Sequence, residues 1–265
     1  MLSIVIVNFK NPALLRLCLK SLNQVLKKDF EKEIIVIDVA GSIQTRNVIT
    51  EEFPQTKLFP FKDNIGFTRG VNEGIKQSSG DNILLLNPDI IALPGAVEDM
   101  YSFMKANPKI GILGPKLLNF DGSDQDSCFR FPAPITFVYR RTILSKLPFA
   151  KKHLDHFLMH DADRSKVLEV DWLFGSPIMI SHAGIDKVGL MDERFFLYLS
   201  DIDWPRRFWE NGFKVVYYPF SKMYHYHIRH SKGRYGLLDF ILKPEGRWHL
   251  MDAIRYFKKY MNTIR

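Results

Sequence analysis

Short apolar strands alternate with helical patterns through the first 118 residues of the chain. The strand-like runs carry Ile, Val and Leu at consecutive positions, which is typical of strands buried on both faces of a sheet. Their alternation with helices predicts an α/β fold with a mostly parallel central sheet flanked by helices and joined by right-handed crossovers. The expected strands cover residues 3–7, 34–38, 58–61 and 82–86, with 110–118 continuing or edging the sheet; the expected helices cover about 12–25 and 94–106, and a glycine-rich stretch at 64–74 leads into a helix to about 78.

Residues 119–170 are the least regular part of the sequence, because Asp121-Gly122 and several prolines break it. We expect a mobile or substrate-shaped insertion there. Beyond it, Ser200 is expected to open a helix as its N-cap, with Asp201 and Asp203 in the first turn, where the helix dipole favours carboxylates. The other expected elements are strands at 178–180 and 214–218, and helices at 182–188 and about 246–260.

The composition is that of an ordinary globular protein, with 46% hydrophobic and 25% charged residues among 265. This length allows one large α/β domain or two small ones. No apolar stretch approaches the roughly 18 residues that span a bilayer, and the first residues lack the features of a secretory signal, so we expect a cytoplasmic protein. Cys18 and Cys128 show no metal-ligand spacing and are expected to be free thiols.

Basic residues concentrate toward the C-terminal end. Residues 204–265 hold 13 Lys and Arg against 4 Asp and Glu, whereas the whole chain has a net charge of +8. Aromatic residues are interleaved with these cations, a mixture that suits an anionic membrane surface. Nucleic acid would be served by the same mixture, and so would a solvated basic face around ordinary core aromatics. Composition alone leaves these three interpretations open.

A candidate ligand site follows the strand at 82–86. The chain continues as Asn87-Pro88-Asp89, so an amide and a carboxylate stand at the carboxyl end of a buried strand, where open α/β sheets bind ligands. Oxygen ligands of this kind suit a hard divalent cation shared with a diphosphate. The motif therefore points to sugar-nucleotide chemistry, although the same three residues also favour a simple turn.

Several segments in sequence resemble the nucleotide-sugar-dependent family 2 glycosyltransferases of the GT-A fold, and among them the rhamnosyltransferase-like branch. The resemblance covers residues 3 to about 231 and implies a catalytic domain over 1–231, in which 119–170 is an acceptor-side insertion, followed by a basic, aromatic helical tail over 232–265. The matching segments are 4–9, 34–38, 64–67 with Gly70, Asn72 and Gly74, 86–89, Asp171-Trp172 with Gly175, and 191–198.

The resemblance implies a set of donor-binding residues. Phe9 would pack on the pyrimidine base and Asp38 would accept its N–H; the alternative for Phe9 is an ordinary core residue. Glycines around Asn64 and Asn72 would let the backbone approach the donor. The full implied donor set is Asn8, Phe9, Asp38, Asn64, Gly66, Asn72, Asn87 and Arg229.

The resemblance also implies a divalent cation, Mg²⁺ or Mn²⁺. Asp89 stands where the family's Asp-x-Asp metal motif falls and would be a ligand, whereas Asn87, in place of the first acid, would contact ribose or phosphate. His225 lies six residues after Pro219, where the family tends to place a histidine that closes the metal or diphosphate site. His227 is a near rival for that role.

For catalysis, the resemblance assigns the general base to Asp201. Inversion at the anomeric carbon requires a base that takes the proton of the acceptor hydroxyl as it attacks. Ser200 stands where the family usually has Glu, and the alternative for Asp201 is a carboxylate that only stabilises its helix. Asp171, Trp172 and Asp203 are the implied acceptor-binding residues.

These inferences predict an inverting glycosyltransferase that binds no nucleic acid. L-Rhamnose from dTDP-rhamnose is the favoured donor, and a saccharide or lipid-linked saccharide of bacterial surface-polysaccharide synthesis is the favoured acceptor. The basic tail and the patch at 140–152 would hold the enzyme at the inner membrane surface. One alternative is a nucleotidyltransferase, which should carry a glycine-rich basic loop after the first strand, where residues 8–12 have a single Lys and no Gly. Another is an inactive membrane-associated scaffold, which Ser200 and Asn87 favour.

Overall fold

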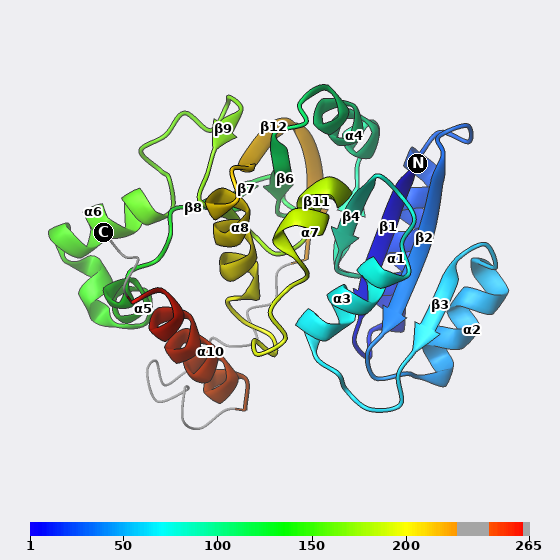
Figure 1. The fold of residues 1–265 in the computed structure, drawn as a ribbon, viewed down its shortest axis with the longest axis horizontal. Coiled ribbons are helices and arrows are strands. Elements are labelled where there is room, and N and C mark those ends of the chain that lie inside the picture. Colours follow the sequence, from blue (N-terminus) through cyan, green and yellow to red (C-terminus); the bar gives the residue numbers. More distant parts are fainter. Residues whose placement is uncertain (227–243, 262–265) are drawn as a thin grey trace.

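The computed structural model describes residues 1–226 and 244–261 of the chain. Its centre is a mixed sheet in which four strands run parallel at one end, and a reversed strand separates them from the rest (Figure 1). β11 is antiparallel to both β4 and β6, whereas β12 is parallel to β6. Across the sheet the order is β3 (Lys57–Pro60), β2 (Lys32–Asp38), β1 (Leu2–Asn8), β4 (Asn82–Leu86), β11 (Ile178–Ser181), β6 (Ile110–Leu118), β12 (Lys214–His225) and β5 (Ile90–Ala92).

Helices cover both faces of this sheet (Figure 1). On β1, Ile4 and Ile6 face the core that α1, α2 and α4 close, whereas Val5 and Val7 face the core that α3, α7 and α8 close. This alternation is the period of two of a strand, and burial on both sides explains the unbroken apolar runs in the sequence. The helices are α1 (Pro12–Val25), α2 (Ile43–Glu52), α3 (Phe67–Lys76), α4 (Ala96–Ala106), α7 (His182–Val188) and α8 (Ser200–Glu210).

A third core joins the C-terminal helix to the rest of the domain. α10 (Pro244–Tyr260) places Tyr256 and Tyr260 against aromatic and apolar residues that include Trp172 and Phe195. The predicted helix at about 246–260 is therefore confirmed. None of the helices within the described residues is both long enough and apolar enough to cross a bilayer.

The predicted α/β class and its central sheet flanked by helices are confirmed, but three expectations need correction. Residues 110–118 continue the sheet, as one of the two expected possibilities, but they are not an edge strand, because β11 and β12 pair on either side. α2 and β5 were not anticipated. Residues 119–170 are more regular than expected: they hold β7 (Asp124–Gln125), β8 (Cys128–Phe129), α5 (Pro134–Arg141), the short helix η1 (Ile143–Lys146), α6 (Pro148–Phe157) and β9 (Leu168–Glu169), and β8 pairs with β10 (Trp172–Leu173).

Candidate active site

The carboxyl ends of β1 and β2 bring two predicted donor-binding residues together. Asn8 lies opposite Asp38 in the parallel register. Its amide donates to Asp38 Oδ1 and to Thr45 Oγ1, each over 3.1 Å, and the N–H of Ser42 donates to Asp38 Oδ2 over 3.0 Å. Because both carboxylate oxygens are held, the orientation of the buried Asp38 is fixed.

Phe9 follows directly on β1 and is 49% exposed. The core interpretation of Phe9 is therefore wrong for this structure, and its ring is available to a planar ligand. The ammonium group of Lys10 lies 5.5 Å from the ring centroid. This combination of a solvent-facing ring and a nearby cation is suited to stacking on an anionic, aromatic ligand.

A three-residue segment before β11 connects the candidate metal and catalytic positions. The ring of Phe174 lies 5.1 Å from that of His225. The N–H of Gly175 donates to the carboxylate of Asp201, and the hydroxyl of Ser176 accepts the N–H of Asn87 over 2.6 Å. Residues 174–176 thus contact the candidate histidine, the candidate base and the strand end at Asn87 from three consecutive positions.

Asp89 and His225 lie together, as the metal assignment requires. Asp89 Oδ2 is 3.7 Å from His225 Nε2. The other oxygen, Asp89 Oδ1, is buried and has no hydrogen-bond partner among the described residues. Gln125 orients the imidazole, because its Oε1 lies 2.9 Å from His225 Nδ1, so that Nε2 is turned toward Asp89.

These groups fit a divalent cation that takes few protein ligands. A carboxylate oxygen without a partner and an imidazole nitrogen are both suitable ligand types. The described residues contain no cluster of three or more His, Cys, Asp or Glu placed to hold a metal. A cation here would therefore complete its coordination with substrate phosphates and water.

Asp201 lies in the first turn of α8, packed against Gly175. A Cβ added at Gly175 would lie 3.0 Å from the Cβ of Asp201, so a larger residue there would push against the candidate base. Burial raises the pKa of Asp201 to about 7, against the opposing effect of the N–H groups of Asp201 and Gly175. A carboxylate poised near neutral pH is suited to general-base catalysis.

Ser200 does not cap α8, contrary to the prediction. The N-cap is Leu199, which has a left-handed backbone with φ of 59°. Ser200 is the first helical residue, and its buried hydroxyl has no hydrogen-bond partner among the described residues. Ser200 thus places a buried hydroxyl without a partner among the described residues next to the candidate base.

The glycine-rich stretch contacts the loop before α8. Asn64 accepts the N–H of Gly66 over 3.0 Å, which forms the turn into α3. Gly66 has φ of 80°, and a Cβ there would lie 2.7 Å from the ring of Phe196. The positive φ and this close contact both require glycine.

The structure gives Asn72 a different role from a donor contact. Its amide donates to the carbonyl of Met191 over 2.9 Å and accepts the N–H of the same residue over 3.0 Å, and it also donates to Glu193. These bonds occupy the side chain. Asn72 therefore fastens α3 to the loop at 191–193.

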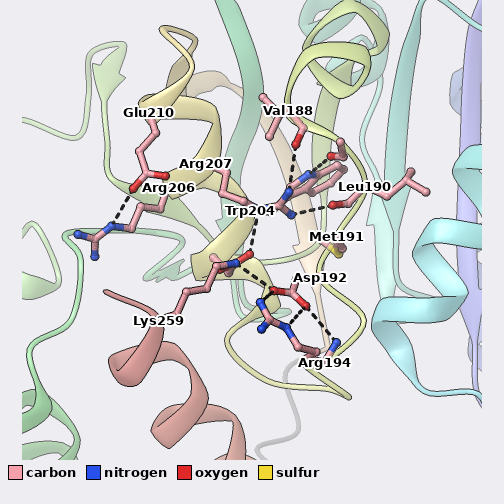
Figure 2. Close-up of polar contacts among 12 residues, drawn as sticks. Val188, Leu190, Met191, Asp192, Arg194, Trp204, Arg206, Arg207, Glu210 and Lys259 are labelled. Atoms are coloured by element: carbon pink, nitrogen blue, oxygen red, sulfur yellow. Dashed lines mark hydrogen bonds and ion pairs between the residues drawn. The ribbon is translucent and has the colours of Figure 1, made fainter. Parts of the chain in front are cut away.

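Asp203, expected near the acceptor, is instead fully buried between α8 and α10. It accepts hydrogen bonds from Arg207, Lys259 and Tyr260 at 3.0, 2.6 and 2.7 Å. Figure 2 shows Lys259 reaching from α10 to Asp192 as well. The carboxylate fastens α10 to the helix that carries Asp201, so the structure does not bring it to the acceptor side.

Asp171 and Trp172 lie at the junction of β8 and β10. Asp171 accepts the N–H of Phe131 over 2.7 Å. Trp172 is buried, stacks on Phe129 at 4.3 Å between ring centroids and donates to the carbonyl of Arg130 over 2.8 Å. Trp172 is thus a core residue, whereas Asp171 keeps a partly exposed carboxylate. Arg229 and the rival His227 lie outside the described residues.

Two residues of the site were not anticipated. Gln125, which orients His225, lies in β7, a strand of two residues that no sequence pattern predicted. Asp252 is buried in α10 and accepts the N–H of Tyr198 over 3.1 Å. Asp252 is the single acid in the centre and last two turns of α10, between Arg247 and Arg255, and this was the available signal, because a buried carboxylate needs donors around it.

Comparison with known proteins identifies the family to which the chain is similar. The family model for glycosyl transferase family 2 matches residues 3–159. An N-acetylglucosaminyl-diphospho-decaprenol L-rhamnosyltransferase of Mycobacterium tuberculosis is 28% identical over 217 residues, which cover 76% of this chain and 68% of that protein. The low-salt glycan biosynthesis hexosyltransferase Agl10 of Haloferax volcanii is 25% identical over 207 residues, covering 76% and 59%.

Solved structures agree on the fold. GalNAc-T7, crystallised with UDP, GalNAc and Mn²⁺, superposes with a TM-score of 0.64 at 14% identity over 88% of this chain. The chain spans 44% of that protein. The family match covers more than half of the sequence, and the sheet flanked by helices agrees with the fold of these structures. The chain therefore belongs to glycosyl transferase family 2 and is a glycosyltransferase with the GT-A fold.

Proposed function

We propose that this glycosyltransferase is an inverting enzyme that moves a sugar from a nucleoside diphosphate to a hydroxyl of a saccharide acceptor. One observation carries the proposal: the three consecutive residues 174–176 contact His225, Asp201 and Asn87 in turn. A donor diphosphate at Asp89 and an acceptor at Asp201 would then meet beside this segment.

Asp201 would supply the base. Its ionised carboxylate takes the proton of the acceptor hydroxyl, whose oxygen attacks the anomeric carbon from the face opposite the diphosphate. The bond between the anomeric carbon and the diphosphate oxygen breaks, and its electron pair leaves with the nucleoside diphosphate. The raised pKa of about 7 makes Asp201 a stronger base than an ordinary carboxylate while leaving it about half ionised at neutral pH.

Asp89 and His225 would hold a divalent cation, Mg²⁺ or Mn²⁺. The cation would neutralise charge that develops on the departing diphosphate. Gln125 keeps the imidazole in the orientation that turns Nε2 toward Asp89. The amide of Asn87 lies beside this pair in sequence and would contact ribose or phosphate.

Asp38 and Phe9 would select the base of the donor. A carboxylate whose orientation is fixed by Asn8 and Ser42 can accept the ring N–H of a thymine or uracil. The exposed ring of Phe9 would stack on the same base. The resemblance to rhamnosyltransferases and the named mycobacterial relative support dTDP-L-rhamnose as the favoured donor.

A lipid-linked saccharide is the favoured acceptor, in a pathway of bacterial surface-polysaccharide synthesis. Support comes from the diphospho-decaprenol acceptor in the name of the mycobacterial relative and from the glycan-synthesis role in the name of the Haloferax one. Such acceptors reside in the membrane, so we further propose that the enzyme works while bound to its cytoplasmic face.

The test uses a panel of sugar nucleotides with a water-soluble saccharide acceptor and Mn²⁺. We expect release of nucleoside diphosphate with one sugar nucleotide and formation of a product whose anomeric configuration, read by NMR, is inverted. Retention of configuration would overturn the inverting mechanism. If thermal shift showed no stabilisation by any nucleotide, the scaffold alternative would replace the enzyme.

A further inference from the structure

α10 carries more apolar surface than its packing on the domain uses. The positions Asp252, Tyr256 and Tyr260 are buried and face α8 and its neighbours. A second stripe consists of apolar residues spaced about one helical turn apart: Leu250, Ile254, Phe257 and Met261. Ile254 is 58% exposed and Met261 is 70% exposed. None of the four residues of this stripe takes part in the hydrogen bonds that the structure describes between α10 and α8, which come from Tyr256, Lys259 and Tyr260.

The second stripe forms one wall of a groove whose other wall is α5. The groove has a volume of about 500 Å³, and we call it the α5–α10 groove. Among the described residues that line it, Lys258 is the charged one. It is lined by Pro134, Phe137 and Val138 from α5 and by Leu250, Ala253, Ile254, Phe257, Lys258 and Met261 from α10. A groove so apolar is suited to hydrocarbon.

More exposed apolar side chains lie next to α5. η1 and α6 both contact α5, and they expose Ile143 (77%) and Phe149 (60%). Figure 1 shows α5, α6 and α10 gathered at one end of the molecule, far from β1, β2 and β3. Large apolar side chains exposed together at one end mark an interaction surface rather than the scattered exposure of an ordinary surface.

The same elements are strongly basic. Residues 134–157 and 244–261 together hold nine Lys or Arg against three Asp or Glu, so they account for an excess of six in a chain whose net charge is +8. One of those three acids, Asp252, is buried. Exposed apolar side chains among cations match an interface in which hydrocarbon underlies negatively charged headgroups.

We infer that the α5–α10 groove, with the exposed residues of η1 and α6, docks on an anionic lipid bilayer and takes acyl chains into the groove. This inference rests on the proposed membrane association and names the surface responsible for it. The surface is basic, so its charge complements an anionic bilayer and would not complement an uncharged protein surface.

Docking there would place the acceptor side of the site near the headgroups. Phe137 of the groove packs edge-on against His249 at 5.7 Å between ring centroids. His249 stacks on Tyr198 at 4.5 Å, three residues before Asp201. A lipid-linked saccharide would then reach the candidate base without leaving the membrane surface.

The first experiment labels one cysteine with an environment-sensitive fluorophore. Cys18 and Cys128 are buried, so Ile254→Cys and the control Ile43→Cys can be labelled selectively. Ile43 is 60% exposed on α2, nearly the same as Ile254. We expect a blue shift for Ile254→Cys with phosphatidylglycerol vesicles, no shift with phosphatidylcholine vesicles, and no shift for Ile43→Cys with either.

The second experiment measures partitioning in vesicle flotation. Leu250→Ser with Ile254→Ser should weaken binding to phosphatidylglycerol vesicles about tenfold or more, since two exposed apolar side chains lose contact with hydrocarbon. Ile43→Ser is the matched control and should bind like wild type. Melting temperatures near that of wild type would show that the variants fold.

The outcomes separate the two proposals. If wild type binds vesicles and the double variant binds equally well, membrane association stands and the α5–α10 groove is wrong. If wild type binds no vesicles, both membrane proposals fail, while sugar transfer to a water-soluble acceptor is unaffected. A blue shift of Ile254→Cys that grows with protein concentration in the absence of lipid would assign the groove to a second copy of the chain and overturn the inference.

Discussion

The backbone N–H of Tyr198 donates to the buried carboxylate of Asp252 over 3.1 Å, which fastens the loop before the candidate base to α10. Arg255 pairs with the other oxygen of Asp252 over 3.0 Å. Because Asp201 follows Tyr198 by three residues, the position of the base depends on a carboxylate that lies 54 positions after Tyr198 in the sequence.

Asp252 is therefore expected to be a positioning residue. Asp252→Ala should lower kcat by ~10- to 100-fold with little change in the donor KM, because a misplaced base slows the chemical step without removing donor contacts. Asp252→Asn keeps an oxygen that can accept the N–H of Tyr198 and should restore much of kcat. Steady-state kinetics on both variants test this, and equal losses in the two would contradict it.

Asp201→Asn should lower the transfer rate by ~10²- to 10⁴-fold, since the amide cannot take the acceptor proton. Donor binding, followed by thermal shift, should remain. In wild type the rate should rise with pH through about 7, because the ionised form is the base. A variant that keeps more than a tenth of the wild-type rate would rule out Asp201 as the base.

The raised pKa of Asp201 also makes the stability of the protein depend on pH. The pKa of about 7 in the folded protein lies above the ordinary value of 3.8, so the folded state holds the proton more tightly than the unfolded chain does. The stability of wild type should therefore fall as pH rises from about 4 to about 7. Asp201→Asn does not titrate, and its free energy of unfolding relative to wild type should increase over this window and then stay constant. Urea unfolding at a series of pH values measures this difference, and a difference that does not vary with pH would contradict it.

Removing either proposed metal ligand should abolish the effect of Mn²⁺ on donor binding. We expect Asp89→Ala and His225→Gln to lose the Mn²⁺-dependent part of the thermal stabilisation by a nucleoside diphosphate. Asp186→Ala, at an exposed position on α7, is the control and should respond like wild type. A full Mn²⁺ response in Asp89→Ala would place the cation elsewhere.

Gly66→Ala tests the close contact between the glycine-rich stretch and the loop before α8. Both Gly66 and Gly122 have positive φ, but a Cβ at Gly66 would lie 2.7 Å from Phe196, whereas one at Gly122 meets nothing within 4 Å. Gly122→Ala thus measures backbone strain alone. Gly66→Ala should destabilise the protein by ~1–3 kcal/mol more than Gly122→Ala, as an overpacked contact does. Equal values of the two in urea unfolding would contradict the role of Phe196.

The parallel half of the sheet was predictable because its strands are buried on both faces and therefore read as unbroken apolar runs. The positions of Asn87 and Asp89 followed from the same pattern, since they come directly after such a run. The reversal of β11 was not predictable, because a short buried run such as Ile178–Ile180 has the same composition in either direction. α2 escaped notice because its apolar positions are few: Val48 and Ile49 are its main buried apolar residues.

Side-chain roles were harder to predict than positions. Asn72 and Asp203 have residue types suited to ligands, yet each is fully occupied by contacts across 119 or 57 positions of sequence. Distant partners of this kind leave no local pattern. Phe9 shows the reverse case, because its apolar side chain allowed either a ligand-facing or a core position, and its exposure decides against the core.

The direction of β11 has a consequence for how the site could change. Ile178 lies opposite Leu85 and Ser181 lies opposite Asn82, so β11 begins at the edge of the sheet where β4 ends. At this edge the chain leaves β1, β2 and β4. It enters β11 at the same edge, because β11 runs in the opposite direction. Residues 174–176 enter β11 at this edge, so a change in this short segment would move the base, the histidine and the strand end together.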